Sequence, residues 1–449
     1  MSVGLLTDYN TINCKFALIN LIATVRKLYN DYSGSYLPGF FFLDIETRQP
    51  LDNLDELPEA DKSVLFHEYV HFIQDITTIF GLINISHTVD IQKTVNEKIL
   101  NDSSPVLQLP VSIDDIATSE INLQLFSLYQ GDHDRDMEAI DHIEMILLED
   151  NGFIAGFETV PAIIVQSIDV NGKSDFFDFG AVCIMESMAY LIQDALFDDV
   201  ESTIFPYHTA KAVCRYLYPE LAEDNLNVII LCDIALNATH PGKFFHDLIL
   251  EMKKQSFKPV DYTDFYDFLE RYKLTNLQGV SLSFYDMFIK QAELAKSQLK
   301  NYFTIPLYDD IRAWIEQIIN LGIDFRVKNI AFWVDILNVP TKTERRNNFI
   351  LLTNVFGFPV MTNLQHHYYF HHPVIIPERI VTLKAIHEIN QILYFGQHGC
   401  GMQDFCRNQK TDITSSLCDE PWKRAKEDPL CPFGQIWKMW GLCEKSPVY

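Results

Sequence analysis

The alternation of hydrophobic and polar positions predicts a mainly helical protein. Apolar residues recur at helical spacing in six stretches, over residues 11–32, 63–80, 178–198, 208–220, 224–237 and 262–320. An aromatic run at Gly39–Ile45 follows a turn and predicts a buried strand, and Phe349–Phe358 indicates a strand or another buried segment. The expected fold class is α+β, predominantly α-helical, with a small sheet.

The length of 449 residues indicates more than one domain. We expect a first domain over residues 1–255 and a helical C-terminal region over residues 256–449, which ends in a cysteine-rich tail at about 396–449. Residues 101–150 carry twelve acidic side chains against a single arginine. This stretch is partly helical in its periodicity and is expected to be an acidic insertion or lid within the first domain.

Composition and charge narrow the class of protein. Hydrophobic residues make up 48% and aromatic residues 13% of the chain, which excludes disorder for most of it. The formal net charge of −26 argues against a protein that binds nucleic acid or an anionic membrane through positive charge. The apolar stretch Phe16–Val25 is too short to span a bilayer and lacks the layout of a signal peptide. We therefore expect a cytoplasmic protein whose cysteines are thiols or metal ligands.

One short motif indicates a particular chemistry. His67–Glu68–Tyr69–Val70–His71 has the pattern H-E-x-x-H within the predicted helix 63–80. Residues four apart lie one above the other on a helix, so two imidazoles can bind one zinc ion while Glu68 activates a water molecule. The polar residues of this helix gather in one arc and the rest is apolar, which favours a buried site over a solvated stripe. The alternative is a pair of histidines without a metal.

This motif resembles the active-site helix of the zincin metallopeptidases. The resemblance covers the single helix 63–80. It implies a zincin-like catalytic domain, a catalytic zinc ion bound by His67 and His71, and Glu68 as the general base. No third histidine follows at the metzincin spacing, so the gluzincin branch, with a glutamate ligand on a later helix, is the better match. The strand Phe40–Ile45 is expected near the cleft, where such strands pair with extended substrates in zincins.

Glu186 is the acid that best fits the third-ligand position of that branch. Apolar side chains surround it at helical spacing, and a buried carboxylate must be paired or bind a metal. A buried salt bridge is the alternative explanation, and Asp194 is an alternative ligand. Thermolysin-like gluzincins place an aspartate four residues after the glutamate to orient a zinc-binding histidine. Here that position is Tyr190, so Asp75 or Asp194 is expected to take the orienting role.

Tyr207 and His208 are candidates for the donor that stabilises an oxyanion. They follow Glu186 in the sequence, and packing at the start of a helix is the alternative. A histidine-rich segment, His366–His372, could bind metal, line the cleft or serve packing, and packing is the favoured interpretation.

Five cysteines cluster in the tail. They are Cys400, Cys406, Cys418, Cys431 and Cys443, and no C-x-x-C pair is present. Four sulfur ligands could bind a second, structural zinc ion that holds a loop-rich tail together. Buried thiols beside tail aromatics are the alternative, and both stay open.

The features together predict zinc-dependent hydrolysis of a peptide bond in an intracellular protein or peptide. The expected partners are that substrate and a regulatory partner, with no nucleic acid and no membrane. Three other functions use the same residues: hydrolysis of a non-peptide amide, a regulated effector or toxin, and a non-catalytic binding module with a zincin fold. The intact Glu68 argues against the last, because a scaffold needs no general base.

Overall fold

The computed structural model describes residues 34–37, 41–51, 53–111, 121–133, 135–149, 159–271, 273–275, 281–364, 368–372, 379–407 and 414–449. The helix predicted over residues 11–32 lies outside these ranges. Within them helices dominate and the strands form small sheets, so the α+β, predominantly helical class is confirmed. None of the described helices combines the length and apolar character needed to cross a bilayer.

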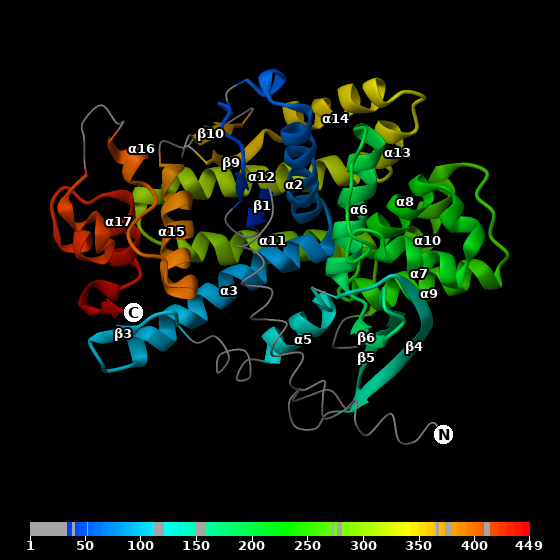
Figure 1. Ribbon diagram of the computed structural model, residues 1–449, viewed down its shortest axis with the longest axis horizontal. Coiled ribbons are helices and arrows are strands. Elements are labelled where there is room, and N and C mark those ends of the chain that lie inside the picture. The colour runs from blue at the N-terminus through cyan, green and yellow to red at the C-terminus, as the bar shows by residue number, and fades with distance from the viewer. Residues whose placement is uncertain are drawn as a thin grey trace.

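Two helices, α2 (Glu59–Thr77) and α6 (Ala181–Leu196), lie side by side and are mostly buried (Figure 1). The other described α-helices are α3 (Ile79–Asn101), α5 (Ile121–Gln130), α7 (Thr209–Leu217), α8 (Asn225–Ala235), α9 (Pro241–Lys254), α10 (Tyr266–Arg271), α11 (Phe284–Tyr302), α12 (Asp309–Lys328), α13 (Phe332–Leu337), α14 (Lys342–Phe356), α15 (Val381–Phe395), α16 (Gln403–Arg407) and α17 (Pro432–Met439). Short 3₁₀ helices occur at η1 (Leu54–Glu56), η2 (Pro219–Glu223), η3 (Tyr262–Phe265), η4 (Pro306–Tyr308), η5 (Ser416–Asp419), η6 (Pro421–Lys426) and η7 (Leu442–Glu444).

The largest sheet has four strands in the order β1-β2-β9-β10. They are β1 (Gly34–Leu37), β2 (Phe42–Ile45), β9 (Phe358–Asn363) and β10 (Tyr368–His371). The predicted strand is thus β2, but it lies inside the sheet, antiparallel to β1 and parallel to β9. Its backbone groups are used on both sides, so the expectation that this strand pairs with a substrate was wrong.

The predicted segment Phe349–Phe358 divides at a glycine. Helix α14 continues to Phe356, Gly357 has φ +73°, and β9 begins at Phe358. A Cβ at position 357 would meet the backbone of His371 and His372, so the chain needs glycine at this turn.

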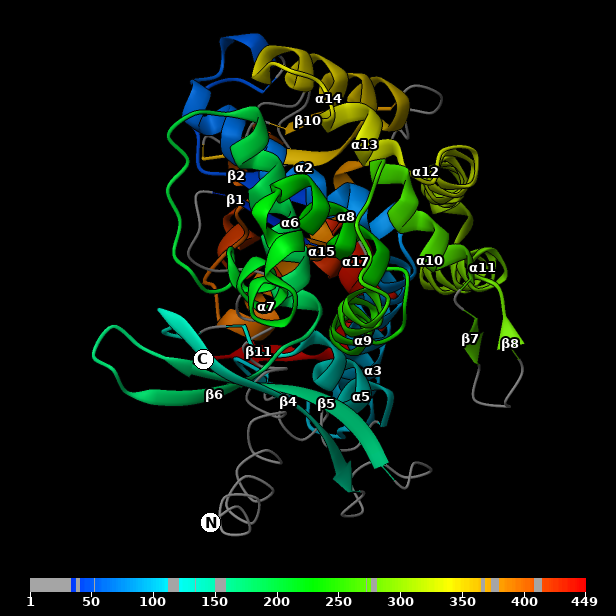
Figure 2. The same cartoon turned by 90° about the vertical axis from the view of Figure 1, so that its right-hand side faces the viewer.

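A second sheet contains the stretch that was expected to be partly helical. Strands β4 (Ala139–Glu149), β5 (Thr159–Ile168) and β6 (Ser174–Asp178) form an antiparallel meander that lies along one side of the molecule, against α7 and α9 (Figure 2). Within the acidic stretch of residues 101–150, α5 is helical and β4 forms a long strand. Two further pairs join β3 (Val106–Gln108) to β11 (Ser446–Val448) and β7 (Leu274–Thr275) to β8 (Ser281–Leu282).

Helix α2 is shorter at its C-terminal end than the apolar pattern predicts. It begins at Glu59 after Pro58, four residues before the predicted start at residue 63. It ends at Thr77, because Thr78 is extended and its hydroxyl accepts a hydrogen bond from the Gly81 amide at 3.0 Å. A second helix, α3, begins at once and was not predicted, since the apolar pattern continues across this break.

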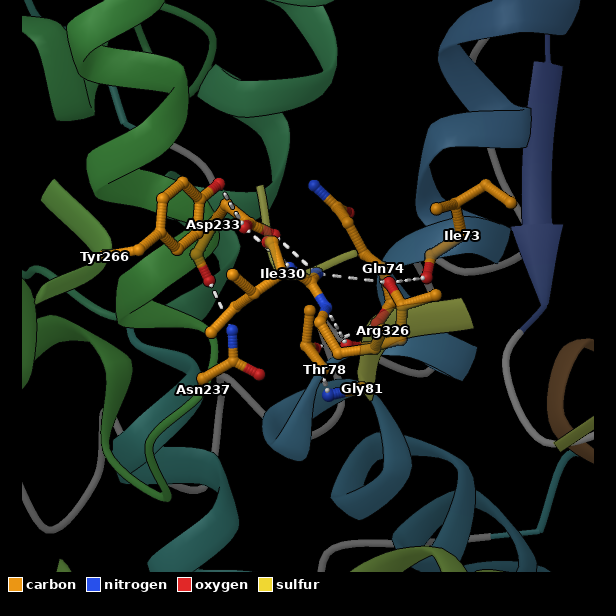
Figure 3. Close-up of polar contacts among 10 residues, drawn as sticks. Ile73, Gln74, Thr78, Gly81, Asp233, Asn237, Tyr266, Arg326 and Ile330 are labelled. Carbon is orange, nitrogen blue, oxygen red and sulfur yellow. Dashed lines mark hydrogen bonds and ion pairs between the residues drawn. The ribbon is translucent and has the colours of Figure 1, made fainter. Parts of the chain in front are cut away.

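Helix α12 clamps the end of α2. A Cβ at Gly322 would collide with the carbonyl of Ile76, so the two helices approach closely at this glycine. One turn later the Arg326 guanidinium donates to the Thr77 carbonyl at 2.8 Å and forms a bidentate pair with Asp233 at 2.7 and 2.8 Å (Figure 3). Both members of this ion pair are fully buried. Helix α2, which carries the H-E-x-x-H motif, is therefore held in place by α12, a helix from the second half of the chain.

The predicted boundary near residue 255 falls just after α9. Elements from both sides of it share the sheet that contains β2 and β9, and they contribute to the same hydrophobic core. The cysteine-rich tail also returns to the first half, because β11 pairs with β3.

Candidate metal centre

The two histidines of the motif lie on the buried face of α2. His67, Glu68 and His71 are each 7–8% exposed, among large apolar side chains of the same helix. The four-residue spacing places the two imidazole rings together, with their Nε2 atoms 3.3 Å apart. The predicted pairing of these two side chains is confirmed.

Helix α6 brings Glu186 to the histidines. Its Oε2 lies 3.2 Å from Nε2 of His67 and 3.5 Å from Nε2 of His71. The Glu186 side chain keeps 25% of its surface exposed, so solvent reaches one side of the group. Among the described residues, these three form the one cluster whose ligand atoms all lie within 4.8 Å of one another.

The triangle has the dimensions of a tetrahedral zinc site. Zinc bonds of 2.0–2.2 Å to nitrogen and oxygen place tetrahedral ligands about 3.3 Å apart. The three observed separations are 3.2, 3.3 and 3.5 Å. Two imidazoles and one carboxylate also leave a fourth position for water or substrate, as a catalytic zinc ion requires. The donor set and its spacing therefore fit zinc.

Two glutamines fix the orientation of the imidazoles. Oε1 of Gln193 lies 3.1 Å from Nδ1 of His67, and Oε1 of Gln74 lies 2.9 Å from Nδ1 of His71. The Gln193 amide nitrogen donates to Ser63 Oγ at 2.8 Å, and that of Gln74 donates to the Met185 carbonyl at 3.1 Å, which orients both amides.

Because an amide oxygen can only accept, each Nδ1 must carry hydrogen. Each Nε2 of the neutral rings then presents a lone pair, and both lone pairs face the carboxylate of Glu186. Three acceptors that converge in this way repel one another unless a proton or a metal ion lies between them.

The glutamines take the role that was expected of an aspartate. Asp75 is fully buried and accepts from Asn84 at 3.2 Å, and Asp194 lies near His208 and Lys211. Neither supplies the partner of an imidazole Nδ1, so that expectation was wrong. Gln193 lies seven residues after Glu186 and thus on the same face of α6, which is the sequence signal that could have identified it.

Electrostatics couples the three ligands. Burial alone would lower the pKa of His71, but the nearby Glu186 carboxylate raises it, with a net value of about 9. Burial would raise the pKa of Glu186, yet the two imidazoles hold it well below its usual range. In the absence of a cation a proton therefore bridges this group, and a metal ion must displace it.

Glu68 lies beside the ligand triangle without belonging to it. Burial raises the pKa of its carboxyl, which the neighbouring histidines only partly offset. A raised carboxyl pKa suits a group that must accept and return a proton near neutral pH. Glu68 is not one of the three residues whose ligand atoms converge.

The structure separates the two candidates for the oxyanion donor. The Tyr207 ring lies edge-on to the His67 ring, with centroids 5.8 Å apart. Ser187, next to Glu186, anchors this loop by donating to the Pro206 carbonyl at 2.9 Å and accepting from the Ala210 amide at 3.0 Å. His208 instead contacts Tyr190 and Ser202. Tyr207 therefore lies beside His67 of the candidate metal centre, whereas no described contact joins His208 to His67, His71 or Glu186.

The histidine-rich segment His366–His372 lies partly outside the described residues. Of its described histidines, His371 is exposed in β10 and His372 is 3% exposed. Neither belongs to the cluster around His67.

No protein-family model, curated protein sequence or solved structure is detectably similar to this chain. The functional interpretation therefore depends on the chemistry of the site.

Proposed function

We propose that this protein is a zinc-dependent hydrolase of peptide bonds, with a zincin-like, gluzincin-type centre. The observation that supports the proposal most directly is the triangle formed by His67 Nε2, His71 Nε2 and Glu186 Oε2, whose sides of 3.2–3.5 Å match tetrahedral zinc. His67, His71 and Glu186 would bind the ion. Zinc in this position supplies a Lewis acid that lowers the pKa of water and polarises a carbonyl.

The other side chains of the site have separate roles in the proposed reaction. Glu68 takes a proton from the attacking water and returns it to the leaving nitrogen. Tyr207 lies against His67, where its hydroxyl serves as the donor to the developing oxyanion. Gln74 and Gln193 keep both imidazoles in one tautomer throughout the reaction. The substrate we propose is a cytoplasmic protein or peptide, because cysteines held as thiols are typical of a reducing compartment.

The test is hydrolysis of an unstructured protein substrate and a peptide library by wild type and Glu68→Gln. We expect Glu68→Gln to retain zinc and lose hydrolysis, because glutamine keeps the shape of the side chain but cannot accept the proton. Tyr207→Phe should bind zinc normally and lower kcat by about 100-fold, the cost of one oxyanion donor. Unchanged turnover in Glu68→Gln would contradict the assignment. A zinc-loaded wild type that cleaves non-peptide amides but no peptide would favour a non-peptide amidase.

A further inference from the structure

Four of the five tail cysteines surround one small pocket. Cys400 lies in the loop after α15, Cys406 on α16, Cys418 on η5, and Cys431 at the start of α17. All four line the same pocket, together with Pro421, Arg424 and Phe433 among others. The fold thus gathers four sulfur atoms from four separate segments.

The fifth cysteine and the tail histidine are excluded from this group. Cys443 lies on η7 and does not line the pocket. The ring of His398 lies against the ring of Tyr449, with centroids 3.8 Å apart and an interplanar angle of 30°. Cys183, Cys214 and Cys232, by contrast, are fully buried in helices of the main core. The four pocket cysteines therefore differ in setting from the other described cysteines.

Hydrogen bonds hold the backbone around these sulfurs in place. The Gly401 amide donates at 2.7 Å to Glu388, whose carboxylate is buried and paired with Lys384. The Cys400 amide donates to the Cys418 carbonyl at 3.0 Å. Cys418 Sγ accepts from the Ser415 amide at 3.5 Å, and Cys431 Sγ accepts from the Gly434 amide at 3.4 Å at a helix N-terminus. These hydrogen bonds fix the segments that carry the sulfurs around the pocket.

We propose that Cys400, Cys406, Cys418 and Cys431 form a second metal centre, a four-thiolate site that cross-links the tail. Four cysteine sulfurs are the ligand set of closed structural zinc sites and of iron–sulfur clusters. Binding transfers the thiol protons to solvent and leaves four metal–sulfur bonds. The described part of the tail consists of short α- and 3₁₀-helices and strand β11, and small elements of this kind gain most from such a cross-link.

The spacing of the sulfurs bears on the identity of the metal. Tetrahedral zinc with bonds of about 2.3 Å holds its sulfurs about 3.8 Å apart. No three of these sulfurs lie within 4.8 Å of one another in the described structure, so a single zinc ion would draw them together. An iron–sulfur cluster places several atoms between its cysteines and needs less closure. Both occupants use the same four thiolates, and the experiment distinguishes them.

The experiment measures zinc, iron and acid-labile sulfide in the full-length protein purified without oxygen or added metal. The background is His67→Ala/His71→Ala, which removes the first site and makes the result independent of the proposed hydrolase function. We expect this variant to retain either about one zinc ion or iron with sulfide and visible absorption. Adding Cys406→Ser or Cys431→Ser should abolish that metal, and adding Cys443→Ser, the matched control, should not.

The result that overturns the proposal is a His67→Ala/His71→Ala protein with neither zinc nor iron and with tail thiols that react rapidly with a thiol reagent. Metal that survives Cys406→Ser/Cys431→Ser unchanged would also overturn it. The thiol measurement needs no cysteine variant, so the proposal stays testable even if a cysteine substitution prevents folding.

Discussion

The amide oxygen of Gln193 lies 3.1 Å from Nδ1 of His67, and the same amide donates to Ser63 at 2.8 Å. This neutral side chain links α6 to α2 and fixes one imidazole tautomer. A partner of this kind tunes a metal ligand nearly as much as the ligand itself does.

Replacement of Gln193 by alanine should weaken zinc binding by about 10- to 100-fold, because His67 loses the acceptor that orients its ring. Competition with a chromophoric chelator measures the affinity. Gln255→Ala, at an exposed glutamine after α9, is the matched control and should leave affinity unchanged. An equal affinity in Gln193→Ala and wild type would show that the contact is incidental.

The two glutamines mark a limit of prediction from sequence. The histidine pair could be predicted because its spacing is local to one helix, and Glu186 stood out as an acid among apolar neighbours. Gln193 is neutral and does not stand out from its neighbours in this way, and its partner His67 lies 126 residues away in the chain. Only the packing of α6 on α2, which no local pattern encodes, brings Gln193 to His67.

In the fold, too, elements set by the local sequence pattern were predictable, and elements set by long-range contacts were not. Helices α2, α6, α7, α8, α11 and α12 overlap the stretches that their apolar spacing predicts, whereas α9 and α15 lie outside every predicted stretch. The break at Thr78 was missed because apolar residues continue through it into α3, and only a side-chain cap and Arg326 on a distant helix fix it. Strand β4 was missed because pairing with β5, rather than its own mixed sequence, determines it.

The stability of the zinc-free protein should fall as pH rises. The pKa of His71 is raised from 6.5 to about 9, so its contribution to stability is complete below pH 6.5 and is lost as pH rises through about 9. Thermal melting of chelator-treated protein across this range should show the loss, and His71→Gln should not. Zinc should reverse the trend, because the ion displaces the proton and binds more tightly at higher pH. A zinc-free protein equally stable at pH 6.5 and 9 would contradict the coupling of His71 to Glu186.

Breaking the Arg326–Asp233 ion pair should lower the free energy of unfolding strongly, whereas replacing both residues with apolar ones should lower it much less. Asp233→Ala leaves a buried guanidinium without its counter-charge and should lower the free energy of unfolding by about 3–5 kcal/mol. The double substitution Arg326→Met/Asp233→Leu should recover much of that loss, since no charge then remains buried. Urea unfolding measures both.

The surface pair Lys300–Glu316 provides the control, and Glu316→Ala should cost less than about 1 kcal/mol. A double variant no more stable than Asp233→Ala would mean that Arg326 acts mainly through its hydrogen bond to the Thr77 carbonyl.

The central claim is that α2 and α6 together bind a catalytic zinc ion through His67, His71 and Glu186. The most direct measurement is the zinc content of dialysed, folded wild type against Glu186→Ala, with Asp194→Ala as the control on the same helix. We predict that Glu186→Ala loses one equivalent of zinc relative to wild type, because two imidazoles alone make a weak site, and that Asp194→Ala loses none. Full zinc content in Glu186→Ala, or loss of the ion in Asp194→Ala instead, would contradict the account.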